Sequence, residues 1–230
     1  MNLNAYDWSR ISASLDECGH AVLPGLLTPA QCDAVQSMYT DEPCFRSHII
    51  MARHGFGVGE YKYFSYPLPA LLKDMRASMY RPLAVIANRW NGMLKQPVEY
   101  PPRLDDFIQR CHAAGQTRPT PLMLKYGAGD YNNLHRDLYG ELAFPLQITV
   151  LLSRPGEDFT GGEFVMTEVR AGQQRVEVVP LEQGDAVVFA VHRRPAQGGQ
   201  GARQVAMRHG VSRIRGGERY TLGVIFHDAT

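Results

Sequence analysis

The sequence predicts a mainly β protein in which a sandwich or barrel from the second half of the chain is buttressed by helices from the first half. Before about residue 115, apolar residues recur at three- and four-residue steps, as on the buried face of amphipathic helices. After Pro119, short segments rich in Val, Ile, Leu, Thr and Phe are separated by Gly, Pro and Asp, which indicates strands joined by turns. Because 230 residues suit one large domain, we expect a single unit with a mainly helical support region at 1–118 and a β core at 119–230.

Three stretches of the first half carry helix signals. Residues 28–31 combine a Thr N-cap, a Pro at the first helical position and a Gln placed for a capping box. An apolar stripe from Leu68 to Trp90 predicts one or two packed helices, with Pro82 as a kink or break. A further helix is expected to open at Pro102 and to end at Gly115.

Seven short segments of the second half are candidate strands, since each combines β-branched, aliphatic or aromatic residues with flanking turn signals. They are Pro121–Tyr126, Gln147–Leu152, Glu163–Val169, Arg175–Val179, Ala186–Val191, Arg203–His209 and Tyr220–Phe226. Residues 170–172 are expected to turn a hairpin, and Gly198, Gly199 and Gly201 to mark a flexible surface loop. This loop is not a phosphate cradle, because the chain has neither GxGxxG nor a GKS or GKT sequence.

Composition and charge exclude several classes of protein. The formal net charge of +1 does not mark the whole molecule as a polyanion binder, so such a role would need a local basic patch. The four cysteines show no CxxC spacing, which favours reduced thiols over a disulfide framework or a cysteine zinc site. No apolar run approaches about 18 residues, and the polar N-terminus with Asp7 does not resemble a signal peptide. We therefore expect a soluble cytoplasmic protein with no membrane association.

Two candidate metal ligands stand close together in the sequence. His135 and Asp137 are two residues apart, so on extended chain both side chains project from the same face. An imidazole and a carboxylate converging there can supply two corners of a metal site. The pattern alone has little specificity, because an HxD tripeptide occurs by chance in many chains of this size.

A candidate third ligand lies far along the chain. His209 ends one predicted strand, glycines form a turn, and Arg219 begins the next strand, so that two neighbouring antiparallel strands would place both side chains in one pocket. Two histidines and one carboxylate leave three positions open on an octahedral ion, and non-haem iron oxygenases need these positions for dioxygen and a bidentate keto acid. His192, which follows the predicted strand Ala186–Val191, is the alternative third ligand, but only His209 is followed by the Gly-Gly-Glu-Arg turn.

The order of these residues resembles that of prolyl hydroxylases and related iron(II)- and 2-oxoglutarate-dependent dioxygenases. Those proteins carry Y-x-x-G, then H-x-D, then a distal His and, further along, a basic residue. The matching residues here are Tyr126 with Gly129, His135 with Asp137, His209 and Arg219, together with the flanking segments Leu146–Leu152, Gly161–Phe164 and Leu181–Phe189. The resemblance covers about residues 121–226 and implies a double-stranded β-helix (jelly-roll or cupin-like) core. Earlier in the chain, Gly19–Tyr39 looks like the strand and helix that often precede this barrel.

The resemblance implies a role for each of these side chains. His135, Asp137 and His209 would hold Fe(II), with no catalytic residue beyond the metal ligands, and Arg219 would pair with the distal carboxylate of 2-oxoglutarate. Dioxygen is the second co-substrate, and ascorbate is a further expected cofactor. The implied reaction hydroxylates or oxidatively demethylates a substrate C–H bond and releases succinate and CO2.

Tyr126 and Thr221 are two further residues expected at the co-substrate. Thr221 lies two positions after Arg219 on the same strand face, so its hydroxyl would reach the same carboxylate. The plainer interpretation makes Tyr126 an aromatic residue of the core and Thr221 an ordinary β-branched strand residue.

Other classes of function stay open on the sequence. A metal-dependent hydrolase would need a general base and commonly a second metal ion, and it would leave Arg219 unexplained. A cupin-type barrel would show an HxH pattern with a Glu, which the sequence lacks. The remaining alternatives are a prolyl-hydroxylase-like protein, a small-molecule hydroxylase and a non-catalytic metal-binding β-domain.

Two features bear on the substrate. Between residues 193 and 219 the chain has seven arginines and one acidic residue, Glu218, so a basic rim beside the metal could follow a phosphate backbone. The segments Met51–Phe64, Ala87–Trp90 and Phe226–Asp228 resemble a bacterial oxygenase family associated with the oxidation of damaged DNA, and their aromatic residues could stack a flipped base. Alkylated DNA or a nucleobase is therefore the expected partner. If the arginines only cover a solvated strand face, the substrate would instead be a protein side chain or a small metabolite.

Overall fold

The computed structural model of the protein describes residues 3–170, 172–198 and 201–230. Its helices are α1 (Trp8–Cys18), α2 (Pro29–Ser37), α3 (Ala70–Met93) and α4 (Leu104–Ala113), with short 3-10 helices at Leu3–Ala5, Met38–Thr40, Glu42–Cys44 and Met51–His54. Its strands are β1 (His20–Leu23), β2 (Phe45–Ile50), β3 (Gly57–Val58), β4 (Glu60–Phe64), β5 (Leu122–Tyr126), β6 (Tyr131–His135), β7 (Leu146–Leu151), β8 (Phe159–Gly161), β9 (Phe164–Arg170), β10 (Gln173–Val179), β11 (Ala186–Ala190), β12 (Arg193–Gly198), β13 (Gly201–Val211), β14 (Ile214–Gly217) and β15 (Arg219–Val224).

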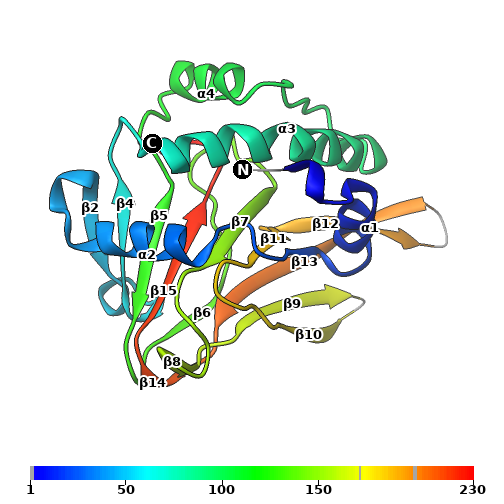
Figure 1. The fold of residues 1–230 in the computed structure, drawn as a ribbon. Coiled ribbons are helices and arrows are strands. Elements are labelled where there is room, and N and C mark those ends of the chain that lie inside the picture. The colour runs from blue at the N-terminus through cyan, green and yellow to red at the C-terminus, as the bar shows by residue number, and fades with distance from the viewer. Residues whose placement is uncertain (1–2, 171, 199–200) are drawn as a thin grey trace.

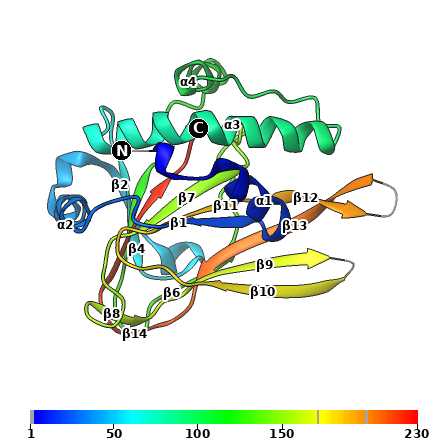
Figure 2. The same cartoon turned by 45° about the vertical axis from the view of Figure 1, so that its right-hand side comes forward.

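Two antiparallel sheets form the body of the protein, and α3 lies along one side of them with α4 outside it (Figure 1). The larger sheet has seven strands in the order β1-β11-β7-β15-β5-β4-β2. The smaller sheet has the order β10-β9-β13-β6-β3, with β12 paired to β13, and the hairpins β9–β10 and β12–β13 extend beyond the rest of it (Figure 2). A third sheet pairs β14 with β8. The prediction of a mainly β fold with a double-stranded β-helix core and a helical buttress is confirmed.

All seven strands predicted for the second half are present, with ends within two residues of those expected. The hairpin expected at residues 170–172 joins β9 to β10, although Ala171 itself lies outside the described residues. Gly199 of the predicted glycine loop also lies outside them, between the paired ends of β12 and β13 at Gly198 and Gly201. Sequence reasoning missed β6, β8, β12 and β14, which are short or polar and therefore lack the apolar alternation of a half-buried strand.

The first half of the chain is mainly helical, as expected, but it also supplies four strands. The predicted strand and helix within residues 19–39 are β1 and α2. The other three strands were not predicted: β4 pairs with β5, β2 pairs with β4 at the edge of the larger sheet, and β3 pairs with β6. The expected division into a helical support at 1–118 and a β core at 119–230 is therefore too simple, because both sheets contain strands from both halves. These strands form by pairing with residues far away in the sequence, and local pattern does not show such pairing.

The helices follow their sequence signals with two corrections. The capping box of α2 is present, since Thr28 Oγ1 accepts from the Gln31 amide and Gln31 Oε1 accepts from the Thr28 amide. The apolar stripe forms one continuous helix, α3, which Pro82 does not break. The N-cap of α4 is Arg103, so Pro102 precedes the helix instead of opening it. Within the described ranges, none of the helices is both long and apolar enough to cross a membrane.

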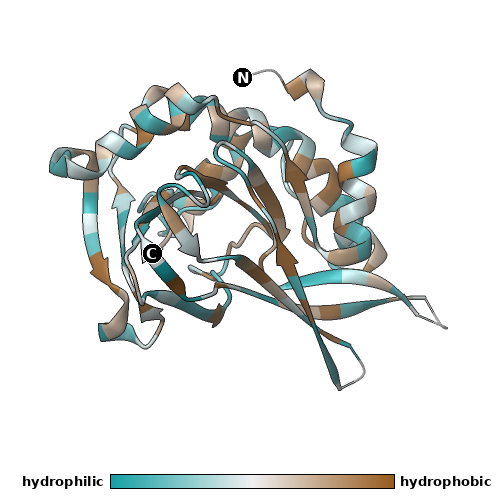
Figure 3. Ribbon diagram, turned by 60° about the horizontal axis from the view of Figure 1, so that its bottom comes forward, coloured by the Kyte–Doolittle hydropathy of each residue, from teal (hydrophilic) through white to brown (hydrophobic). Residues whose placement is uncertain are grey.

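Hydrophobic residues concentrate in strands at the centre of the fold (Figure 3). In the middle of the larger sheet, every residue of β7 and β11 is buried. Between this sheet and the helices lies an aromatic cluster in which Phe144 contacts Tyr80 of α3 and Phe107 of α4, with ring centroids 5.0 and 6.0 Å apart. Aromatic pairs at this separation add stabilisation beyond their buried area. The cluster therefore attaches the helical layer firmly to the β core.

A buried ion pair makes a second attachment. Arg76 of α3 and Asp228, near the C-terminus, are both almost completely buried, and Arg76 Nη2 lies 2.8 Å from Asp228 Oδ1. Arg76 also donates to the Ile225 carbonyl, and the other Asp228 oxygen lies 2.8 Å from His112 Nε2 of α4. Asp228 thus joins α3, α4 and the segment that follows β15.

We expect Arg76→Met to destabilise the protein by about 3–5 kcal/mol, because it leaves the buried Asp228 carboxylate without its main counter-ion. Thermal and denaturant unfolding measure the change. The matched control is Arg103→Met, whose pair with Asp105 is 71% and 74% exposed and which should cost less than about 1 kcal/mol. Equal and small effects of the two substitutions would show that the buried pair is not important for stability.

Candidate metal centre

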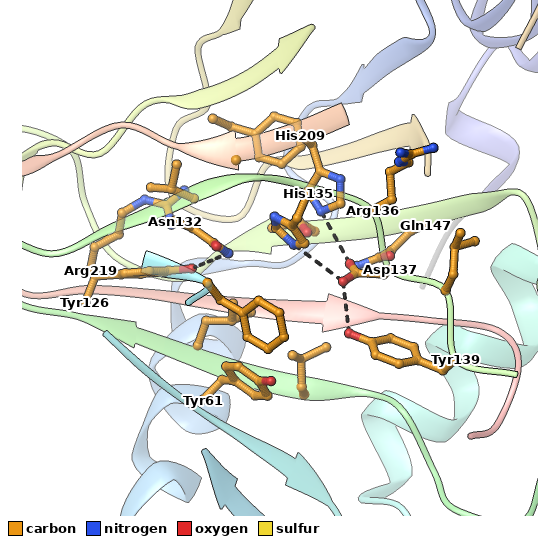
Figure 4. Close-up of a pocket in the computed structure, with 18 residues that line it drawn as sticks. Tyr61, Tyr126, Asn132, His135, Arg136, Asp137, Tyr139, Gln147, His209 and Arg219 are labelled. Atoms are coloured by element: carbon orange, nitrogen blue, oxygen red, sulfur yellow. Dashed lines mark hydrogen bonds and ion pairs between the residues drawn. The ribbon is translucent and has the colours of Figure 1, made fainter. Parts of the chain in front are cut away.

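The two strands β6 and β13 bring the predicted metal ligands together. They are antiparallel neighbours, and their register places His209 directly opposite His135, with ring centroids 4.3 Å apart. Asp137 lies two residues beyond the end of β6. Its carboxylate faces both rings: Oδ1 lies 3.4 Å from His135 Nε2, and Oδ2 lies 3.3 Å from His209 Nε2 (Figure 4). The donor atoms of all three residues lie within 4.8 Å of one another, so the predicted convergence is confirmed.

Two hydrogen bonds orient these side chains. His135 Nδ1–H donates to the Asn133 carbonyl at 2.7 Å, so Nε2 is the ring nitrogen that faces Asp137. The Tyr139 hydroxyl donates to Asp137 Oδ1 at 2.9 Å. Partners of this kind hold metal ligands in their binding orientation. Tyr139 was missed in the sequence, although its position two residues after Asp137 is a signal that could have identified it.

The electrostatics of the cluster favour a charged carboxylate. Burial opposes ionisation of Asp137, but hydrogen bonds from His135 and His209 outweigh it and hold the pKa of Asp137 well below its usual value. Burial, together with the charge of His135, lowers the pKa of His209, which favours the neutral ring. Asp137 and His209 thus favour the forms that bind metal ions, a carboxylate and a neutral imidazole, whereas for His135 the effect of burial is outweighed by interaction with Asp137, which raises its pKa.

Arg219 is a buried cation that has no carboxylate within ion-pair distance in the described part of the chain. It is the first residue of β15, lies opposite Tyr126 of β5 in register and is 2% exposed. Its Nε and Nη1 have no hydrogen-bond partner, and burial lowers the pKa of Arg219 to about 10. The guanidinium lies near the rings of Tyr126 and Phe159, 5.8 and 5.7 Å from their centroids. A Cβ added to Gly162 would lie 2.9 Å from Arg219 Cδ, so this glycine leaves room for the arginine.

A single cavity of about 310 Å³ connects the three ligands to Arg219 (Figure 4). Tyr126 lines this cavity, as expected. Thr221 is buried on the strand face that Arg219 shares, but it is not among the lining residues, whereas Thr149 of β7 is. The predicted role of Thr221 at the co-substrate is thus not supported by contact with the cavity.

The rest of the cavity combines apolar walls with amide oxygens that have no partner among the described residues. Phe56 and Tyr61 come from the first half of the chain. Asn132 and Gln147 are polar residues of the lining, and the buried Oδ1 of Asn132 and Oε1 of Gln147 have no hydrogen-bond partner. Sequence analysis did not assign Asn132 or Gln147 to the site. It included Phe56 and Tyr61 only as members of the aromatic-rich segment Met51–Phe64. Buried unpaired amides are costly unless a ligand completes their hydrogen bonds.

His192, the alternative third ligand, lies outside the His-Asp-His cluster. Its Nδ1 lies 2.8 Å from Arg136 Nη1, and it does not line the metal cavity. The basic rim predicted from the run of arginines at 193–219 is also not found at the cavity. Arg194 is buried in an ion pair with Glu168, the five exposed arginines of that run are absent from the lining, and the exposed arginine that does line it is Arg136.

Comparisons with known proteins agree with this geometry. The family model Oxygenase-NA, described as an oxygenase catalysing oxidative methylation of damaged DNA, matches residues 59–229. Uncharacterized proteins from two strains of Mycobacterium tuberculosis are each 47% identical over 167 residues, which is 72% of this chain and 72% of theirs.

Similar solved structures include a prolyl-4-hydroxylase of Pseudomonas putida, which aligns over 97% of this chain and 100% of its own with a TM-score of 0.58 and 14% identity. An oxidoreductase of the 2OG-Fe(II) oxygenase family from Burkholderia pseudomallei aligns over 100% of this chain and 96% of its own, with a TM-score of 0.53 and 15% identity. At these identities the likeness shows a shared fold.

We expect His209→Ala to weaken metal binding at least tenfold, about 1.4 kcal/mol, because one of three donor atoms is lost. The matched variant His192→Ala should bind metal as the unchanged protein does, since its ring faces Arg136. Anaerobic titration with Fe(II), or with Mn(II) followed by electron paramagnetic resonance, measures both. Metal binding that survives in His209→Ala but not in His192→Ala would reverse the assignment.

Proposed function

The chain belongs to the Oxygenase-NA family and is an iron(II)- and 2-oxoglutarate-dependent oxygenase, and we propose that it oxidises a methylated base of nucleic acid. One observation carries the proposal: a cavity joins a His-Asp-His cluster to a buried guanidinium that has no anion. The cluster suits a metal ion and the guanidinium suits a carboxylate, so the cavity has places for both parts of a chelated keto acid.

The donor set fits iron(II). The cluster offers three donor atoms: Nε2 of His135, Nε2 of His209 and a carboxylate oxygen of Asp137. Non-haem iron oxygenases use this set of two histidines and one carboxylate. His209 Nδ1 is buried without a hydrogen-bond partner, and His209 Nε2 is the nitrogen that faces Asp137. Bound iron(II) would supply the activation of dioxygen that is coupled to decarboxylation of 2-oxoglutarate to succinate and CO2.

Arg219 fits the distal carboxylate of 2-oxoglutarate. The guanidinium can offer two parallel N–H donors to a carboxylate, a charge-assisted contact of about 1.5–3 kcal/mol that also selects for a planar anion. Tyr126 would flank this carboxylate, because its ring lies beside the guanidinium and its hydroxyl accepts from Asn132 Nδ2 at 3.3 Å. Thr149 is better placed than Thr221 to add a hydroxyl, since it lines the cavity. Ascorbate is not part of this proposal.

The remaining walls suit a planar, hydrogen-bonding substrate. Tyr61 and Phe56 provide aromatic surface against which a base extruded from a strand could stack. Gln147 is 4% exposed, and its Oε1 has no partner among the described residues, so it can accept a hydrogen bond from the edge of a base. Oxidation of a methyl group on nitrogen places one oxygen atom of dioxygen on that carbon and the other in succinate. The hydroxymethyl product then releases formaldehyde and leaves the unmodified base.

We expect Arg219→Met to raise the 2-oxoglutarate concentration needed for half-maximal succinate formation about ten- to a hundredfold, because each tenfold change corresponds to about 1.4 kcal/mol. The assay is the slow conversion of 2-oxoglutarate to succinate without substrate. The control Arg175→Met removes an exposed arginine of β10 and should leave this concentration unchanged. Unaltered binding of 2-oxoglutarate in Arg219→Met would remove this residue from the site.

The substrate is tested by incubating the iron-loaded protein with 2-oxoglutarate and either methylated single-stranded oligonucleotides or methylated nucleosides. Formaldehyde and the unmodified base should appear in stoichiometric amounts, and Gln147→Met should reduce this turnover at least tenfold while substrate-free succinate formation continues. Succinate formation without formaldehyde from any methylated base would contradict the proposed substrate but not the assignment as an oxygenase.

A further inference from the structure

Three basic side chains lie together next to the metal cavity, whose lining includes one of them, the exposed Arg136. Arg136 lies between the two ligands of the HxD tripeptide, and its Nη1 is 2.8 Å from His192 Nδ1. Arg193 directly follows His192 and begins β12. Both arginines are exposed, and the three residues come from two segments that lie far apart in the sequence.

The positive charge of this cluster is not neutralised. Among the described residues, neither Arg136 nor Arg193 has a carboxylate within ion-pair distance. Arg154, by contrast, pairs with both Glu157 and Asp158. The side chain of Arg193 donates to Gln204 instead. Burial and the charges of Arg193 and Arg136 lower the pKa of His192, and no carboxylate offsets them.

A second cavity of about 180 Å³ shares Leu138 with the lining of the metal cavity. Its lining includes His192 and Arg193, together with Asn91, Gln96 and Gln204, and contains no acidic residue. Leu138 is 48% exposed and lines both cavities, while Arg136 lines the metal cavity. The basic cluster therefore contributes to the linings of both cavities, Arg136 to one and His192 and Arg193 to the other.

We propose that Arg136, His192 and Arg193 form a phosphate-binding site for the backbone of single-stranded DNA whose modified base enters the metal cavity. The inference rests on the proposed function. A base can reach a cavity of about 310 Å³ only after leaving its stack, and its flanking phosphates must then lie near the opening. Two exposed guanidinium groups without counter-ions match such phosphates in charge, and each can offer paired N–H donors to a phosphate.

The site is local, which explains how a chain with net charge +1 could bind a polyanion. Arg208 provides a contrast. Like Arg193, it is an exposed arginine of residues 193–219. It directly precedes His209 on β13, so its side chain projects from the strand face opposite to that of His209. Substituting Arg208 removes the same charge from the molecule without touching the cluster.

The experiment measures fluorescence anisotropy of a labelled methylated single-stranded oligonucleotide across a salt series for the unchanged protein, Arg193→Gln, the double variant Arg136→Gln/Arg193→Gln, and Arg208→Gln. For the unchanged protein, log affinity should fall linearly with log salt. The slope should become shallower by about 0.7 for Arg193→Gln and by about 1.4 for the double variant, since each phosphate contact on a single strand contributes about 0.7. Arg208→Gln should keep the original slope, and thermal unfolding confirms that each variant is folded.

Equal losses in Arg193→Gln and Arg208→Gln, or no change in the double variant, would overturn the site. Binding of an acidic peptide in place of the oligonucleotide would also overturn it and would indicate a protein partner. Turnover of a methylated nucleoside, which has no phosphate, separates the two proposals. Nucleoside turnover without salt-sensitive DNA binding removes only the phosphate site, whereas absence of product from both nucleoside and oligonucleotide removes the proposed substrate as well.

Discussion

The metal centre depends on the antiparallel pairing of β6 with β13. This pairing places His209 opposite His135 and lets the two Nε2 atoms converge on Asp137. The register is irregular between His209 and Val211, and a Cβ on Gly210 would lie 2.7 Å from the Asn132 carbonyl oxygen. The close approach of the two backbones at this point therefore requires glycine. Because a shift of one residue would turn His209 away from Asp137, the whole site relies on this register.

Arg219 shows how the fold prepares for a ligand. A guanidinium with unpartnered nitrogens in the interior is costly, and the surrounding rings of Tyr126 and Phe159 reduce this cost only in part. Gly162 gives the arginine its space, so the Gly161–Phe164 segment shapes the pocket around Arg219 through packing. A dicarboxylate keto acid would supply the missing charge, and its binding would consequently stabilise the folded protein.

The first half of the chain is part of the site as well as its support. It contributes Phe56, beside β3, and Tyr61 of β4 to the cavity walls. These strands are held by pairing with β6 and β5, the same strands that carry His135 and Tyr126. The aromatic cluster around Phe144 and the Arg76–Asp228 pair then fix α3 and α4 against the β core. The aromatic residues of the cavity wall and the candidate metal ligands thus belong to one packed unit. This packing keeps the wall at a fixed position relative to the ligands.

The sequence by itself determined the order of chemical groups: an HxD tripeptide, a distal His209 with its glycine turn, and Arg219, along with seven core strands and the α2 capping box. These features follow from short-range periodicity and residue type, which local pattern records. Only the tertiary structure decided that β2–β4 join the sheets, that Thr149 and not Thr221 lines the cavity, and that Arg136 with His192 and Arg193 forms the basic cluster. Each of these depends on contacts between segments distant in the chain, and side-chain direction at such contacts is set by register and packing instead of by neighbouring residues.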